Sequence, residues 1–243
     1  MLLGKLLSNG KEQAGIYAQS FRIIEILSNY GYLFTIILLP VFSKMIKQGE
    51  SVEHLTRLSF TLMMIPAIII TFGCLVYRNE IMGILYHEHV ESSARVFGIL
   101  IFSFLGMCIT YIFGTLLTAN GSLLQLNTMA LLAVSVNLSL NVILIKKYGV
   151  MGAAIANMTT QLFTSVYQII LTKRTFHLHT DVKLVVRLIT FILLVAAGSM
   201  LISRIPVFWV YSLGIYLLFA SMLSVLLGLL KIRSAWEIVF YDK

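Results

Sequence analysis

The sequence predicts an all-α protein that crosses a membrane several times, and three observations support this prediction. First, 59% of the 243 residues are hydrophobic and only 12% are charged, whereas a soluble domain is about 45–50% apolar and about 25% charged. Second, apolar stretches of the roughly 20 residues that a spanning helix needs recur along the chain. Third, the connections between these stretches are short, so we expect no inserted soluble domain. The predicted fold is a multi-pass transmembrane helical bundle.

Seven stretches qualify as spanning helices, six of them clearly and the first with internal charges: Ala14–Met45, Leu58–Tyr77, the two halves of Val96–Ile145, Gly149–Thr172, Leu188–Ser203 extended by Val182–Val186, and Pro206–Leu230. The run Val96–Ile145 has no charged residue and no histidine. As a helix it would be about 75 Å long, enough for two spans. The turn-forming sequence Thr118–Ser122 divides it. In the longest connection, Arg78–Ser93, we expect an amphipathic turn that rests on the membrane surface.

The net charge of +8 does not indicate nucleic acid as a partner. The basic residues lie in short loops between apolar runs, where they face anionic headgroups and set the topology. Ten basic residues on one side against seven on the other weakly favour placing the loops Lys44–Arg57 and Lys173–Lys183 in the cytoplasm. The cysteines Cys74 and Cys108 lie within apolar runs and predict no disulfide.

Polar residues within the spans are the best candidates for function, because each must find a partner in the membrane. In the first span, Arg22, Glu25, Asn29 and Tyr32 fall within about 80° of the helix circumference. An intramembrane arginine predicts a binding role. Arg22 and Glu25 are three residues apart and can pair, so the alternative is an ion pair that only holds two helices together.

Further polar stripes lie on later spans and predict a shared hydrated cavity. Their candidate residues are Asn137 and Asn141 on the fourth span and Asn157, Gln161 and Gln168 on the fifth. The alternative is hydrogen bonding between helices, worth about 0.6 kcal/mol per contact. The last two spans carry only scattered serines without a stripe, and we expect them to be peripheral helices that face lipid.

No motif of an enzyme, a metal site or a cofactor is found. His87-Glu88-His89 lies in a loop with no further ligand cluster nearby, which predicts solvated side chains rather than a metal site. The chain has no Gly-rich phosphate loop, zinc protease helix or nucleophile elbow. We therefore expect a protein that is not an enzyme and needs no cofactor.

Three stretches carry a family resemblance: Gly15–Ser43 with Arg22 and Glu25, Thr118-Ala119-Asn120-Gly121, and Asn137–Ala156 with Tyr148-Gly149-Val150-Met151-Gly152-Ala153-Ala154. They resemble the polysaccharide-transporter branch of the multidrug/oligosaccharidyl-lipid/polysaccharide exporter superfamily, which includes O-antigen flippases and the lipid II flippase. That family is commonly built from two six-helix lobes, often with two extra C-terminal helices. The resemblance implies the second lobe of a MATE-like exporter fold plus two peripheral C-terminal helices.

The resemblance also implies how the chain is divided. Residues 1–13 would be the end of a truncated helix and an extracytoplasmic loop, and 14–175 a five-helix portion of the C-terminal transporter lobe. Residues 181–231 would form two further transmembrane helices and 232–243 a cytoplasmic tail. The expected partners are membrane lipids, a lipid-linked oligosaccharide substrate and a missing N-terminal lobe of the same protein.

The function implied is flipping of undecaprenyl-pyrophosphate-linked oligosaccharide across the bacterial inner membrane for surface polysaccharide biosynthesis. Arg22 matches in position an arginine thought to hold the pyrophosphate in the lipid II branch. The first alternative is a cation-coupled multidrug exporter, for which Glu25 is the one acidic cavity candidate. The second is a membrane glycosyltransferase or polymerase, which would need a catalytic loop outside the membrane.

Overall fold

The computed structural model describes residue 3 and residues 9–179 and 181–230. The predictions for the cytoplasmic tail, and for most of residues 1–8, lie outside this part of the chain. Within it the structure is helical and contains no strand. The helices are α2 (Gly10–Gln48), α3 (Glu53–Val76), α4 (Arg78–Leu85), α5 (Val90–Ala119), α6 (Leu123–Tyr148), α7 (Val150–Phe176), α8 (Val182–Ile202) and α9 (Trp209–Leu226).

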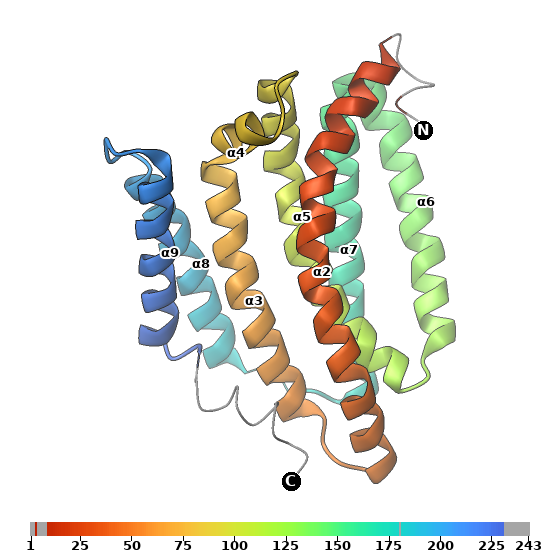
Figure 1. The fold of residues 1–243 in the computed structure, drawn as a ribbon. Helices are drawn as coiled ribbons and strands as arrows, with labels where there is room; N and C mark the ends of the chain where they lie inside the picture. Colours follow the sequence, from red (N-terminus) through yellow and green to blue (C-terminus); the bar gives the residue numbers. More distant parts are fainter. Residues whose placement is uncertain (1–2, 4–8, 180, 231–243) are drawn as a thin grey trace.

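Six of the described helices are long and apolar enough to cross a membrane, namely α2, α3, α5, α6, α8 and α9. The remaining predicted span, Gly149–Thr172, corresponds to α7, which has 27 residues and runs beside α5 (Figure 1). Because of its Asn, Gln and Thr residues, α7 has no stretch as apolar as those of the six other helices. The short α4 forms where we expected an amphipathic turn, with Met82 buried and Ile84 and Leu85 exposed.

The bundle is organised around α5, which packs against α2, α3 and α7. Figure 1 shows α6 at one edge, beyond α7, and α8 and α9 at the other edge, beyond α3. The core consists of large side chains with no exposed surface on α5, such as Phe97, Phe104 and Ile112, together with Ile24 of α2 and Met63 of α3. The helix α5 is therefore central, while α6 joins the bundle mainly through α7, and α8 and α9 join it through α3.

Two breaks in the regular backbone pattern are compensated. Pro66 continues α3 but has no N–H, so the carbonyl of Leu62 lacks its partner within the helix. The hydroxyl of Tyr30 on α2 donates to that carbonyl at 3.3 Å and thereby joins the two helices. The predicted turn after Thr118 forms with Gly121 at φ 74°, a left-handed conformation that suits glycine.

The last two helices are peripheral, as predicted, but the prediction that α9 has no stripe is wrong. The structure buries one face of α9, made of Ser212, Tyr216, Ala220 and Ser224. The Tyr216 hydroxyl donates to the carbonyl of Ile69 on α3 at 2.8 Å, and the Tyr77 hydroxyl donates to Ser212 Oγ at 2.6 Å. Residues four apart share a helix face, so the spacing of these residues was a readable signal.

Candidate functional site

The polar stripe on α2 lies on the side of the helix that is turned away from α5. Ile16 and Ser20 are buried at the α5 contact, while Glu25 and Asn29 are exposed. Each exposed residue follows its buried counterpart by nine positions, which corresponds to a rotation of about 180° on a helix. Arg22 belongs to the same exposed face, so the structure brings Arg22, Glu25 and Asn29 together on one open surface.

The predicted pairing of Arg22 with Glu25 is absent from the ion pairs of the described residues. The Arg22 side chain has neither an ion pair nor a hydrogen bond with any residue that the structure describes. Both side chains are exposed, and so is Tyr32, with 55% of its surface accessible. In this conformation Arg22 and Glu25 therefore do not join two helices through an ion pair, and the Arg22 guanidinium is available to a ligand.

The stripe begins near one end of the bundle and runs inward. Ser20 Oγ donates to the Ser93 carbonyl at 2.8 Å, and Ser93 Oγ donates to Gln19 Oε1 at 2.6 Å. These bonds place this part of α2 level with the first turn of α5, just before the uncharged run that starts at Val96. Arg22 thus lies close to the edge of the apolar layer, and Tyr32 lies about 15 Å further along the helix.

A second polar group joins α6, α7 and α2. Asn137 Nδ2 donates to Thr160 Oγ1 of α7 at 3.1 Å, and Asn141 Nδ2 donates to Asn137 Oδ1 at 2.9 Å. One turn before Thr160, the Asn157 side chain lies beside Tyr17 of α2. All these side chains are half-buried. Asn137 and Asn141 therefore lie in one hydrogen-bonded cluster, with Asn157 one helical turn away beside α2.

Gln161 and Gln168 lie instead between α7 and α5. Gln161 Nε2 donates to Thr110 Oγ1 at 3.3 Å, and the side chain packs against Gly106. Gln168 is 2% exposed and packs against Gly114. In this conformation both glutamines take part in helix packing, and neither belongs to the accessible face of α2. The cavity role predicted for them stays a prediction.

Comparison with known proteins assigns the chain to a family. The model of the family described as "Lipid II flippase MurJ" matches residues 16–222, which is most of the chain and includes the α2 stripe and the α6–α7 cluster. The chain belongs to the MurJ lipid II flippase family. It is also 28% identical over 148 residues to the "Probable low-salt glycan biosynthesis flippase Agl15" of Haloferax volcanii. That match covers 60% of this chain and 31% of the relative, so the chain spans about a third of the relative's length.

Membership of the MurJ family confirms the prediction of a multi-pass membrane protein related to lipid-linked flippases, and it favours a flippase over a multidrug exporter. Flippases are transporters and not catalysts, in agreement with the expected absence of enzyme chemistry. Among the described residues, no group of three or more His, Cys, Asp or Glu side chains could hold a metal ion. His87, Glu88 and His89 are exposed, and His89 Nδ1 lies 3.5 Å from Glu12 Oε1.

One polar network was missed by the sequence analysis of this MurJ-family chain. Arg57 of α3 contacts Asp181 at 2.8 Å and Glu53 at 3.0 Å. Asp181 also caps α8 by accepting from the Leu184 N–H, and His179 lies 3.5 Å from Glu53. The network ties the α7–α8 connection to α3. Two signals could have revealed it, namely the i,i+4 spacing of Glu53 and Arg57 and an aspartate directly before an apolar helix.

Proposed function

We propose that this chain forms one side of the path along which a flippase moves undecaprenyl-pyrophosphate-linked oligosaccharide across the bacterial inner membrane for surface polysaccharide biosynthesis. The observation that carries the proposal is the exposed face of α2, on which Arg22 has no partner among the described residues. Support also comes from the MurJ family match and from the relative whose name describes glycan biosynthesis.

The chemistry of this face suits a phosphorylated sugar. A guanidinium binds phosphate oxygens through two parallel hydrogen bonds, which an ammonium does not. Asn29 and Tyr32 continue the stripe inward and supply the donors and acceptors that sugar hydroxyls need. Arg22 would hold the pyrophosphate while the sugar moves along the stripe and the lipid tail stays in the bilayer.

The same face implies a partner body. Glu25 and Asn29 would be costly in contact with lipid, yet no other described helix covers them. A second helical lobe that encloses the stripe would create a hydrated path between the two bodies. We therefore expect the 243-residue chain, purified and reconstituted alone, to show no flipping of a fluorescent lipid-pyrophosphate sugar. Robust flipping by that preparation would refute the need for a second lobe.

The substrate role of Arg22 is tested by substitutions made at the chromosomal gene, so that everything else the gene encodes is retained. We expect Arg22→Ala to abolish nearly all surface polysaccharide. Arg22→Lys keeps the charge but loses the bidentate bond, and should lower the flipping rate by about tenfold or more, since hydrogen bonds to charged groups contribute about 1.5–3 kcal/mol. Lys11→Ala, which removes another exposed cation of α2, is the matched control and should leave the rate unchanged.

A double substitution separates binding from packing. If Arg22 and Glu25 only formed an ion pair once a second lobe covers this face, replacing both with leucine would preserve transport, because a buried ion pair is often replaceable by apolar residues. If Arg22→Leu/Glu25→Leu made as much surface polysaccharide as the wild type at matched expression, the binding role of Arg22 would be refuted. A loss equal to that of Arg22→Ala, in a variant with an unchanged melting temperature, would support it.

A further inference from the structure

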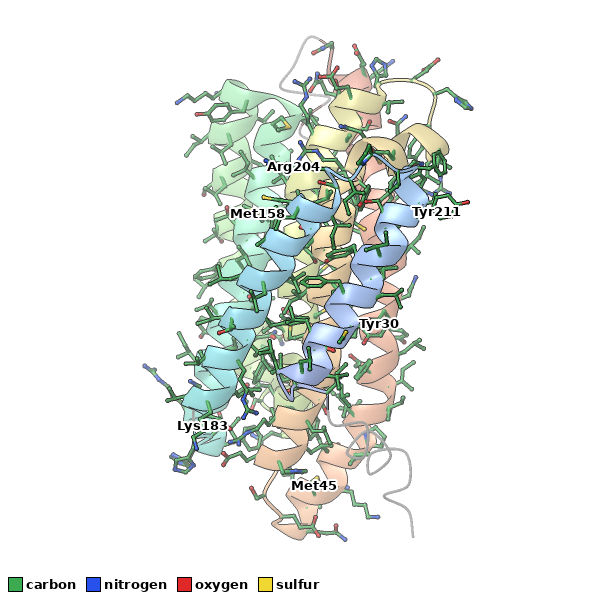
Figure 2. The ribbon with its side chains drawn as sticks, turned by 90° about the vertical axis from the view of Figure 1, so that its left-hand side faces the viewer. Tyr30, Met45, Met158, Lys183, Arg204 and Tyr211 are labelled. Atoms are coloured by element: carbon green, nitrogen blue, oxygen red, sulfur yellow. The ribbon has the colours of Figure 1, made fainter. Side chains whose placement is uncertain are left out.

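A cavity of about 340 Å³ lies at the end of the bundle where α3 and α8 begin and the chain leaves α9. In Figure 2, Lys183 marks this end together with Met45, while Arg204 and Tyr211 mark the opposite end. The Arg22 stripe begins at that opposite end, level with the first turn of α5. The cavity is thus a separate feature from the proposed substrate path.

The cavity combines an apolar wall with a surplus of positive charge. Its apolar side chains include Leu58, Leu62, Leu184 and Leu229, and its cations are Arg57, Lys183 and Arg187. Arg57 contacts two carboxylates, Asp181 at 2.8 Å and Glu53 at 3.0 Å, so its charge is more than offset. Lys183 and Arg187 have no ion pair with any residue that the structure describes. The two unpaired charges therefore attract an anion.

The depth of these cations matches the headgroup region of a bilayer. Lys183 is the second residue of α8, and Arg187 follows it by four positions, about 6 Å. The remainder of α8, Leu188–Ile202, contains no charged residue. Side chains on a helix tilt toward its N-terminus, so the Arg187 guanidinium reaches back toward the level of Lys183. Its Nη1 lies 3.8 Å from the position that a Cβ on Gly228 would occupy.

We propose that this cleft between α3 and α8 binds the phosphate of an anionic phospholipid, held by Lys183 and Arg187 with the acyl chains against the leucine wall. Basic pockets between transmembrane helices are typical binding sites for anionic lipid headgroups. The cluster of Arg57, Asp181 and Glu53 holds one cation against two carboxylates, so the positive charge open to a ligand is that of Lys183 and Arg187 on α8. The ligand chemistry is a phosphate monoanion, and the leucine side chains select a lipid over free phosphate.

The test measures lipid binding to the purified chain in zwitterionic detergent by native mass spectrometry. The probes are dioleoyl phosphatidylglycerol and, as the neutral reference, dioleoyl phosphatidylcholine. Each cation near an anionic surface contributes a factor of about five to binding, so Lys183→Gln/Arg187→Gln should weaken phosphatidylglycerol binding by about 30-fold. Lys146→Gln/Lys147→Gln removes an exposed basic pair at the other end of the bundle and should leave binding unchanged.

Three results would overturn the proposal. Undiminished phosphatidylglycerol binding in Lys183→Gln/Arg187→Gln, or an equal loss in the control pair, would show that no local site exists. Complete displacement of the lipid by excess sodium phosphate would assign the site to free phosphate. Lys183→Arg/Arg187→Lys keeps both charges and should bind as the wild type does. If the double glutamine variant does not fold, Lys183→Gln alone should weaken binding by about fivefold.

Discussion

Substitution of Gly152 by alanine tests how closely α6 and α7 are packed. A Cβ added at Gly152 would collide with the backbone carbonyl of Leu144 on α6 and would lie 2.9 Å from the amide nitrogen of Ile145. Backbone atoms cannot turn aside as a flexible side chain can, so α6 must move away from α7. The helix α6 packs mainly against α7, and such a shift would strain the Asn137–Thr160 hydrogen bond of 3.1 Å.

The expected loss follows from two effects. Overpacking of a well-packed interface costs about 1–3 kcal/mol, and a weakened interhelical hydrogen bond in a membrane protein costs about 0.6 kcal/mol more. Alanine in a helix interior regains about 1 kcal/mol relative to glycine. We therefore expect Gly152→Ala to reduce the free energy of unfolding by about 2 kcal/mol. This is enough to lower the melting temperature measurably.

Gly214→Ala on α9 is the matched control, because nothing lies within 4 Å of a Cβ added there. Without a clash only the helix propensity remains, so this substitution should leave stability unchanged or raise it slightly. The assay heats the protein in detergent and measures the fraction that stays folded by size-exclusion chromatography with fluorescence detection, which gives the melting temperature. A melting temperature for Gly152→Ala equal to or above that of the wild type would refute the close packing of α6 on α7.

Two further predictions concern the α2–α3 contact and the topology. Tyr30→Phe removes the donor to the Leu62 carbonyl and should cost about 1 kcal/mol of stability in the same unfolding assay. The control, Tyr32→Phe on the exposed face, should cost nothing. Equal melting temperatures of the two variants would contradict the role of Tyr30. A membrane-impermeant maleimide added from the periplasm should label Glu88→Cys and not His179→Cys. The two residues lie in connections at opposite ends of the bundle (Figure 1). Strong labelling of His179→Cys would reverse the proposed orientation.

The helices could be predicted from the sequence because composition alone defines them. The uncharged run Val96–Ile145 divides at the turn after Thr118, and the structure ends α5 at Ala119 and begins α6 at Leu123. The start of α2 at Gly10, four residues before the expected Ala14, reflects how charged residues such as Lys11 and Glu12 continue a helix beyond the apolar layer. Hydrophobicity locates the part of a helix that crosses the membrane, but it does not locate the residues at which the helix begins and ends.

The direction in which a polar stripe faces could not be predicted in the same way. The stripes of α2 and α7 have similar spacing, yet Glu25 and Asn29 stay exposed while Gln161 and Gln168 pack against α5. The neighbour that a stripe contacts depends on the arrangement of the other helices. The periodicity of a single helix does not contain that information. The Glu53–Arg57 spacing and the helix cap at Asp181 were readable signals, but the contact of Arg57 with Asp181 was not, since 124 positions separate the two residues.

The difference between the α2 and α7 stripes has a physical cause that lies on α5. Gln161 and Gln168 are seven positions apart, and the glycines that they contact, Gly106 and Gly114, are eight positions apart, about two helical turns in each case. A long polar side chain needs such a gap to enter a helix interface, and an added Cβ at Gly106 would come within 3.0 Å of Gln161 Cγ. No comparable gap receives the stripe of α2, because its buried face already meets α5 through Ser20 and Ile24. The glycines of α5 thus direct the polar groups of α7 into packing, and the unmatched polar groups of α2 are the ones that we propose to meet a ligand or a second lobe.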